Sequence, residues 1–295
     1  MQANYGQLIK HLRKKRDVTQ EELAKKLFIS QRTLSNVEKG TAELNLLQFR
    51  SAFSILGVVI EDYWIIFLTP EELDVYLQYK KMKSLLGSGG IDELRDIYSD
   101  IKHSSLVQKP FLNQFISYIG VITDEIMPDN KKLKNLDTAL RKSIRNFEGE
   151  KIGEYRLSYS EVLIVGEIAL LYARLGKRDN AIQLLDGIVQ NIDNTRITNE
   201  DKIMLLPKPL TDLATLFMEE GEYEKAAVIC EKALEMVRAN MNIRFGPVAA
   251  YTLGICHHKM GSDNYMHFLA IAYHTARAFA QNDLAEKIRG EYDVL

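Results

Sequence analysis

Residues 19–40, TQEELAKKLFISQRTLSNVEKG, decide how the first part of this chain folds. Thr19 is a helix-capping residue, and the amide and acidic side chains that follow it predict the first turn of a helix. Small and apolar residues then recur at helical spacing until residues 28–30 interrupt them. A second short helix is predicted over residues 31–39 and ends at Gly40. Two short helices joined by a tight turn predict a helix-turn-helix unit.

The second predicted helix has a polar face that suits contact with DNA bases. Leu34 and Val37 point inward, so the outer face carries Gln31, Arg32, Thr33, Ser35 and Asn36. Glutamine and asparagine pair with adenine, arginine pairs with guanine, and a threonine methyl group meets the methyl group of thymine. We therefore expect this helix to read bases in the major groove, while Gln20 and Lys39 contact phosphates. An ordinary amphipathic hairpin with a solvated polar face is the alternative.

The distribution of charge favours the DNA-binding interpretation. Residues 1–60 contain ten Lys or Arg and five Asp or Glu, a balance of +5, whereas the remaining residues contain 28 and 35, a balance of −7. The densest basic cluster consists of His11 and residues 13–16. We assign this cluster, with Arg13 in it, to phosphate contacts.

The rest of the sequence predicts helices throughout, so the expected fold class is all-α. Glycine, proline and asparagine divide the chain into segments of about 12 to 20 residues with helical apolar spacing. No apolar run approaches the ~18 residues of a membrane span, and the N-terminus lacks a secretory signal, so we expect a cytoplasmic protein. Cys230 and Cys256 are expected to be small core residues. The apolar stretch at residues 60–69 is expected to pack on a neighbouring domain or in a dimer contact.

Three hairpins in the second half of the chain have tetratricopeptide-like spacing of small and apolar residues. The clearest runs from Lys208 to Ala239 with its turn at Gly221, and weaker copies turn at Gly176 and Gly261. The loops at residues 191–207 and 239–246 are expected to absorb the excess over a repeat of about 34 residues. Residues 70–148 predict two or more degenerate hairpins. The set predicts a right-handed helical solenoid, with a generic α-helical bundle as the alternative.

A solenoid of hairpins has a concave wall formed by the first helix of each pair. The residues that we expect on this wall are Glu167, Arg174, Asp212, Thr215, Tyr251 and His258, joined by Asn113, Gln114 and Tyr118 from the helix at residues 111–126. Amide side chains can hold a peptide backbone, and Arg174 can bind a carboxylate. The pattern therefore indicates a groove that binds a peptide.

Residues 9–40, IKHLRKKRDVTQEELAKKLFISQRTLSNVEKG, resemble the Cro/repressor-type (XRE) helix-turn-helix family. The resemblance covers residues 5–68 and implies a five-helix, lambda-repressor-like domain. It also implies DNA contacts at the positions matching Gln20, Gln31, Arg32, Thr33, Ser35, Asn36 and Lys39. Phe28 stands where the family usually has glycine, so we expect it either to alter the turn or to pack on a neighbouring element. The stretch TAELNLLQF at 41–49 replaces the usual Asn-Pro-Ser.

The whole chain resembles the Rgg/PlcR/PrgX-type (RNPP) quorum-sensing regulators, which join such a domain to a tetratricopeptide-like solenoid. The resemblance implies a DNA-binding domain at 1–68 and a peptide-binding and dimerisation domain at 69–295. It implies a homodimer on an inverted-repeat operator in double-stranded DNA. A short signalling peptide in the concave face would then control transcription.

Two other classes of function stay open. The solenoid of a helix-turn-helix repressor can bind a protein partner in place of a peptide. An enzyme is the second alternative, because Cys256, His257 and His258 are adjacent, but no metal-ligand spacing, phosphate-binding loop or nucleophile motif accompanies them. His257 falls at a packed repeat position and is expected to be a core residue. We expect no enzymatic activity, no cofactor and no metal.

Overall fold

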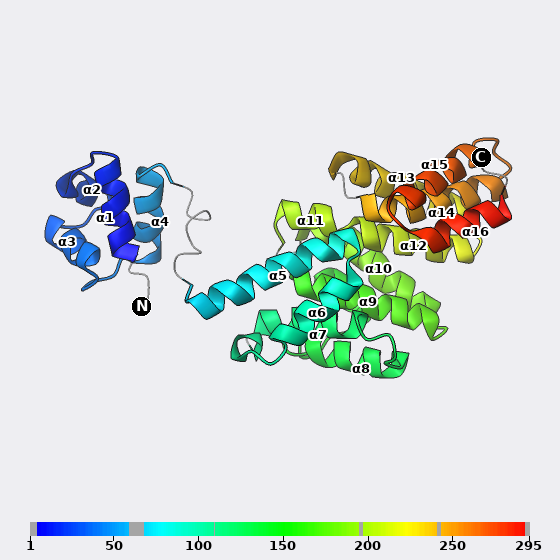
Figure 1. Ribbon diagram of the computed structural model, residues 1–295, viewed down its shortest axis with the longest axis horizontal. Helices are drawn as coiled ribbons and strands as arrows, with labels where there is room; N and C mark the ends of the chain where they lie inside the picture. Colours follow the sequence, from blue (N-terminus) through cyan, green and yellow to red (C-terminus); the bar gives the residue numbers. More distant parts are fainter. Residues whose placement is uncertain (1–4, 59–67, 109, 195–196, 241–242, 293–295) are drawn as a thin grey trace. The chain divides into compact units, whose positions relative to one another are not determined.

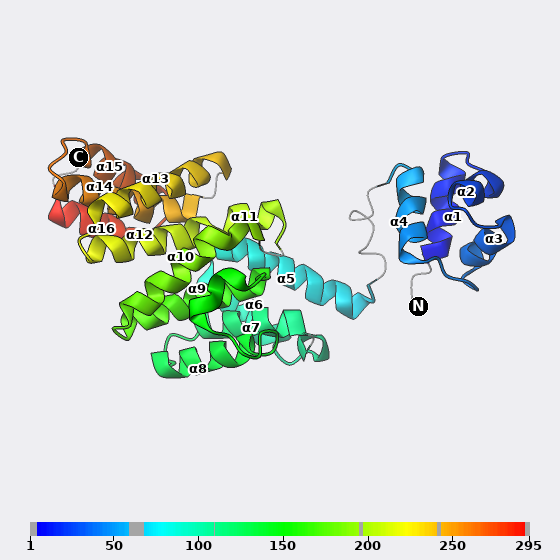
Figure 2. The same cartoon turned by 180° about the vertical axis from the view of Figure 1, so that it is seen from behind.

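The computed structural model describes residues 5–58, 68–108, 110–194, 197–240 and 243–292. Regular structure in these ranges is helical and includes no strand, which confirms the predicted all-α fold class. The chain divides into two compact units, Met1–Lys80 and Lys81–Leu295, whose helices are labelled from two sides in Figure 1 and Figure 2. The division falls within α5 (Pro70–Ser88), so a domain boundary after residue 68 stays a prediction. Residues 59–67, with most of the apolar stretch and the place of a fifth helix, lie outside the described residues.

Four short helices of the first unit pack around one apolar core. They are α1 (Tyr5–Lys15), α2 (Gln20–Lys26), α3 (Gln31–Lys39) and α4 (Leu46–Ile55). The core side chains include Ile9, Leu12, Leu23, Ala24, Leu27, Leu34 and Phe53. Ala24, a small residue of α2, is buried in this core.

The helix-turn-helix segment has the caps that the sequence predicts at Thr19 and Gly40, and a further cap at Ser30. The Thr19 hydroxyl accepts a hydrogen bond from the Glu22 N–H at 3.1 Å, and the Glu22 carboxylate accepts one from the Thr19 N–H at 2.7 Å. Ser30 caps α3 by accepting from the Thr33 N–H at 3.0 Å. Gly40 ends α3 with a φ of 78°, in the left-handed region that glycine enters without a Cβ clash.

Phe28 keeps the turn geometry that glycine usually provides. Its φ is 55°, which costs a non-glycine residue on the order of 1 kcal/mol. Its side chain is 95% exposed, so the expectation that Phe28 packs on a neighbouring element is wrong for the described structure. The backbone of the turn, held at both sides by the capped helices, imposes the left-handed conformation on this residue.

The second unit continues from the end of α5 as a series of packed helices. They are α6 (Ile91–Ile101), α7 (Pro110–Ile122), α8 (Asp129–Leu140), α9 (Tyr159–Arg174), α10 (Arg178–Asn191), α11 (Asn199–Leu205), α12 (Pro207–Glu219), α13 (Tyr223–Asn240), α14 (Gly246–Lys259), α15 (Tyr265–Ala278) and α16 (Asn282–Glu291). Four 3₁₀ turns interrupt the series: η3 (Ser105–Gln108), η4 (Gly149–Glu154), η5 (Ile192–Asn194) and η6 (Ile243–Phe245).

Helix pairs α9–α10, α12–α13 and α14–α15 are the three predicted hairpins. Their turn glycines, Gly176, Gly221 and Gly261, have φ values of 77°, 83° and 73°, which explains why glycine occupies each turn. The segment at 191–207 differs from the prediction, because it contains η5 and α11 where the sequence predicts a loop. The short helix α11 starts at a Thr198 cap whose hydroxyl accepts from the Asp201 N–H at 3.2 Å.

Small residues fill the crossings of the paired helices. Ala214, Ala226 and Ala272 are fully buried, as are Cys230 and Cys256. Both cysteines are free, and burial raises the pKa of the Cys256 thiol to about 11 and that of Cys230 further. They are therefore the small core residues that the sequence predicts.

Gly187→Ala is expected to destabilise the second unit. A Cβ on Gly187 in α10 would lie 2.0 Å from Cγ2 of Ile152, a buried residue of η4, so one of the two elements must move. We expect the free energy of unfolding to fall by about 1–3 kcal/mol, measured by urea denaturation followed by circular dichroism.

Gly290→Ala in α16 is the matched control, because no atom lies within 4 Å of its added Cβ. Alanine favours the helix at this position, so the free energy of unfolding is expected to stay unchanged or to rise by up to about 1 kcal/mol. Equal effects of the two substitutions would contradict the close packing of η4 on α10.

Candidate functional site

Helix α3 presents the polar face that the sequence predicts. Gln31, Arg32 and Lys39 are exposed, and Thr33, Ser35 and Asn36 are partly exposed on the same helix. The opposite face buries Leu34 and Val37 in the core. Within the described residues, the side chains of Gln31 and Arg32 have no hydrogen-bond partner, so both are available to an incoming ligand.

A buried ion pair holds α1 against α3. Arg13 donates from Nε to Glu38 Oε1 at 2.6 Å and from Nη2 to Glu38 Oε2 at 3.0 Å. Its third contact runs from Nη1 to the Val18 carbonyl at 2.9 Å. Burial acts to raise the pKa of Glu38, but the hydrogen bonds from Arg13 and Gln20 and the nearby positive charges outweigh it and hold this pKa below its ordinary value.

This geometry corrects the assignment of Arg13 to phosphate contacts. The Arg13 side chain is 9% exposed, and its guanidinium is engaged by three contacts inside the unit. A buried bidentate arginine–carboxylate pair would lose its partner if the arginine turned outward to a phosphate. Arg13 therefore positions α1 against α3. The exposed basic residues on α1 and directly after it are Lys10, His11, Lys14, Lys15 and Arg16.

Gln20 lies at the first turn of α2, beside the same pair. Its amide nitrogen donates to Glu38 Oε2 at 2.7 Å, and the residue is partly exposed. One of its side-chain N–H groups is thus engaged by Glu38. This bond holds Gln20 beside Glu38, in the last turn of α3.

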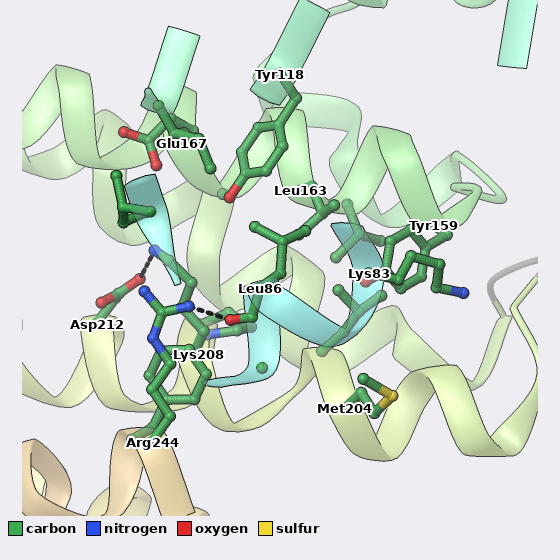
Figure 3. A pocket seen from close by; sticks show the side chains of 18 of the residues that line it. Lys83, Leu86, Tyr118, Tyr159, Leu163, Glu167, Met204, Lys208, Asp212 and Arg244 are labelled. Carbon is green, nitrogen blue, oxygen red and sulfur yellow. Dashed lines mark hydrogen bonds and ion pairs between the residues drawn. The ribbon is translucent and has the colours of Figure 1, made fainter. Parts of the chain in front are cut away.

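The second unit contains a cavity of about 440 Å³ between the predicted first helices and the end of α5. Helices α7, α9 and α12 line it together with α5, α11 and η6, as Figure 3 shows from close by. Its apolar wall includes Leu86, Ile122, Leu163 and Phe245. An apolar cavity with a few placed charges is the usual form of a ligand site.

Most of the charged side chains around the cavity are paired. Lys208 Nζ lies 2.7 Å from Asp212 Oδ2, and Arg174 Nε lies 3.0 Å from Asp129 Oδ2. Burial acts to lower the pKa of Lys208, but the charges of Asp212 and Glu167 outweigh it and raise this pKa, so the ammonium stays charged. Burial and the charge of Glu167 raise the pKa of Tyr118, so its hydroxyl stays protonated and remains a hydrogen-bond donor.

Four of the residues predicted for a peptide groove meet in this cavity. They are Tyr118, Glu167, Arg174 and Asp212. The hydroxyl of Tyr118 and the amine of Lys208 point into the same space in Figure 3. Helical periodicity therefore located the walls contributed by α7, α9 and α12.

Five predicted groove residues lie outside the cavity, because other contacts engage them. Gln114 is buried and donates to the Ala139 carbonyl at 3.1 Å and to Ser143 Oγ at 2.7 Å. The other engaged side chains are Asn113 with Lys142, Thr215 with the Thr211 carbonyl, Tyr251 with Glu291, and His258 beside Tyr265 and Tyr292. Helix α14 does not line the cavity, so the predicted wall of the third hairpin is displaced from it.

The sequence did not identify four cationic residues at the cavity, which are Lys83, Lys132, Lys208 and Arg244. Lys83 lies on α5, where weak amphipathicity gives no inward face to count from. Lys208 begins the hairpin predicted at Lys208 to Ala239, and it precedes Asp212, the first residue of that hairpin predicted to face the groove. Arg244 lies in the 3₁₀ turn η6 between two hairpins, where helical periodicity assigns no direction.

The histidine pair near the end of α14 takes part in aromatic packing. His257 is partly buried and stacks on Phe268 with ring centroids 4.9 Å apart. In the ranges that the structure describes, no three His, Cys, Asp or Glu side chains form a group suited to a metal ion. No described helix combines the length and apolar character needed to cross a membrane.

Comparison with known proteins identifies the first unit and the overall fold. Residues 9–59 match the family model described as helix-turn-helix. The chain has no sequence match among curated proteins.

Solved structures share its fold over nearly the whole chain. PlcR of Bacillus thuringiensis, in complex with the peptide PapR7 and DNA, has a TM-score of 0.74 at 16% identity and covers 97% of this chain and 99% of its own. ComR of S. thermophilus, with DNA and its signalling peptide ComS, has a TM-score of 0.62 at 14% identity, covering 97% of both chains. The SHP pheromone receptor Rgg2 of Streptococcus dysgalactiae has a TM-score of 0.60 at 14% identity, covering 98% of both. These likenesses confirm the predicted fold.

Glu38→Ala is expected to loosen the helix-turn-helix. Removal of the carboxylate leaves the Arg13 guanidinium buried without an anion, which costs about 3–5 kcal/mol. Hydrogen-exchange mass spectrometry on the full chain should show faster exchange in α1 and α3, while the second unit is unchanged. Glu43→Ala, at an exposed loop carboxylate, is the control and should leave exchange as it is.

The same pair predicts a dependence on pH. The pKa of Glu38 lies below its ordinary value of 4.5, so its contribution to stability is complete above that pH and is lost as the pH falls through the folded pKa. The difference in exchange between wild type and Glu38→Ala should therefore shrink on acidification. A difference that persists unchanged at low pH would contradict an ionised Glu38.

Proposed function

We propose that this chain is a sequence-specific DNA-binding transcriptional regulator whose activity is controlled by a short signalling peptide. The exposed polar face of α3, within a segment that matches the helix-turn-helix family, is the observation that carries the proposal. PlcR and ComR, which share the fold, are described in complexes with both DNA and a peptide. The same fold favours a regulator over the enzyme that the sequence left open.

DNA reading is assigned to the N-terminal part of α3. Arg32 and Gln31 have the reach and the donor groups to contact guanine and adenine, respectively. Thr33, Ser35 and Asn36 extend the same face, and Lys39 and Gln20 contact phosphates. Arg13 is left out of this set, because its guanidinium holds Glu38 inside the unit.

The peptide is assigned to the cavity of the second unit. Its apolar wall accepts side chains, and Tyr118, Glu167, Arg174 and Asp212 offer polar groups to a peptide backbone. We assign dimerisation to the second unit as well, and place the protein in the cytoplasm.

A homodimer would set two α3 helices about 34 Å apart, one turn of the DNA, so the operator is expected to be an inverted repeat. Peptide binding can alter DNA binding only through different affinities for two arrangements of the dimer. A coupling of about 1–3 kcal/mol is typical of such regulators.

The DNA-binding part is tested with duplexes from the region upstream of the protein's own gene. Fluorescence anisotropy with the full chain should give binding that weakens steeply with salt, because each phosphate contact releases counterions. Absence of salt-sensitive binding to any of these duplexes would contradict the proposal. If short peptides leave the melting temperature unchanged, the second unit binds a protein partner instead.

Arg32→Ala is expected to weaken operator binding by about 1–3 kcal/mol and to relax base preference at one operator position. The measurement is the affinity for the operator and for duplexes substituted at each position. Lys14→Ala is the matched control, because Lys14 is an exposed cation on α1 away from the recognition face. It should lower all affinities evenly or not at all. A wild type and an Arg32→Ala variant with the same sequence preference would contradict the assignment of α3.

A further inference from the structure

Arg244 is a cation at the cavity wall without an anion. It lies in η6 and donates from Nη1 to the carbonyl of Leu86 in the last turns of α5. Its guanidinium carbon lies 5.4 Å from the centre of the Phe245 ring. Within the described residues, no carboxylate forms an ion pair with it. Burial lowers the pKa of Arg244, although the guanidinium remains protonated at neutral pH.

The other cavity cations differ from Arg244 in this respect. Their ion pairs are Lys83 with Asp201 at 2.6 Å, Lys208 with Asp212 at 2.7 Å and Arg174 with Asp129 at 3.0 Å. Lys132 also lines the cavity, but it is a partly exposed lysine on α8 that water can reach. A partly buried guanidinium that lacks an anion gains most from an anionic ligand, since it has already lost water.

Tyr118 offers a second donor to the same space. Its side chain is 3% exposed, and in the described structure its hydroxyl has no hydrogen-bond partner. Figure 3 shows the Tyr118 hydroxyl and the Arg244 guanidinium entering the cavity from opposite sides, one from α7 and the other from η6. A carboxylate accepts through two oxygens, so it can take a hydrogen bond from each donor.

We infer that Arg244 and Tyr118 bind a carboxylate of the ligand, and that in a short peptide this group is the C-terminal carboxylate. The inference rests on the proposed function, because it assumes that the ligand is a peptide. Leu86, Ile122 and Phe245 line the cavity near these donors, so the last side chain of the peptide is apolar. Arg174 is not the carboxylate-binding residue that the sequence suggested, because Asp129 engages its guanidinium.

The carboxylate site adjoins the end of α5. Arg244 binds the Leu86 carbonyl, and Lys83, one turn earlier, binds Asp201 and lies 4.0 Å from the centre of the Tyr159 ring. The last turn of a helix has free carbonyl groups that favour a cation. An anion bound to Arg244 therefore changes the net charge beside the C-terminal end of α5. Helix α5 begins at Pro70, which follows the helix-turn-helix segment in the sequence.

Affinity-selection mass spectrometry on the full chain tests the inference. The probes are pools of apolar heptapeptides without Asp or Glu, synthesised as free acids or as C-terminal amides, and a third pool of amides that contain one Glu. Wild type should retain free acids over amides by at least roughly thirty-fold, because a desolvated charge pair is lost in the amide. Arg244→Gln should abolish this preference, and Tyr118→Phe, which removes only the hydroxyl, should reduce it.

Lys83→Gln is the matched control, because it removes from the same cavity a cation that already has a carboxylate partner. It should leave the preference for free acids intact. Retention of the amide pool by Arg244→Gln at the wild-type level shows that the cavity is folded.

Three results would overturn the inference in distinguishable ways. Equal retention of acids and amides by wild type would contradict a carboxylate site at Arg244 and Tyr118, but it would agree with the proposal that the cavity binds a peptide. Retention of the Glu-containing amides at the level of the free acids assigns Arg244 to an acidic side chain and removes the C-terminal assignment. Retention of no pool by wild type overturns the peptide-binding proposal itself.

Discussion

The close approach of paired helices through small side chains is the constraint on which the second unit depends. Alanine, cysteine and glycine at the crossings let α9, α12 and α14 pack directly on their partners, and a larger residue would force the pair apart. The first helices of two hairpins, α9 and α12, then face the same space as α7. The cavity results from this arrangement, since α10, α13 and α15 contribute none of the described residues that line it.

In both units, a buried charged side chain forms an ion pair with a side chain of opposite charge. In the first unit, the Arg13–Glu38 pair joins α1 to α3 and leaves the outer face of α3 free of internal partners. In the second unit, Lys208 and Asp212 form a pair four residues apart on α12. Arg244 differs from these paired side chains, because a backbone carbonyl is its only acceptor among the described residues. An unpaired guanidinium is costly to maintain in a protein interior and is therefore informative about what binds there.

The sequence predicted those features that depend on local patterns. The capping residue Thr19 and the turn glycines marked helix boundaries in the helix-turn-helix and in three hairpins. The sequence failed where long-range contacts decide a side chain's role. Arg13 lies in a basic cluster of the sequence, which predicts a surface cation. In the structure its guanidinium is buried in a pair with Glu38, 25 residues later in the chain. Gln114 and Tyr251 occupy inward-looking positions by periodicity, yet neighbouring helices engage them. Arg244 lies in an irregular turn, so no periodic pattern assigned it to the cavity.

Coupling between the cavity and α3 is tested most directly by a closed thermodynamic cycle. The affinity of the full chain for an upstream duplex is measured with and without a saturating peptide, and the affinity for that peptide is measured with and without the duplex. The two affinities should change by one common factor, roughly 5- to 150-fold, because linkage is reciprocal. Affinities that do not respond to each other would contradict a regulator in which the second unit controls DNA binding by the first.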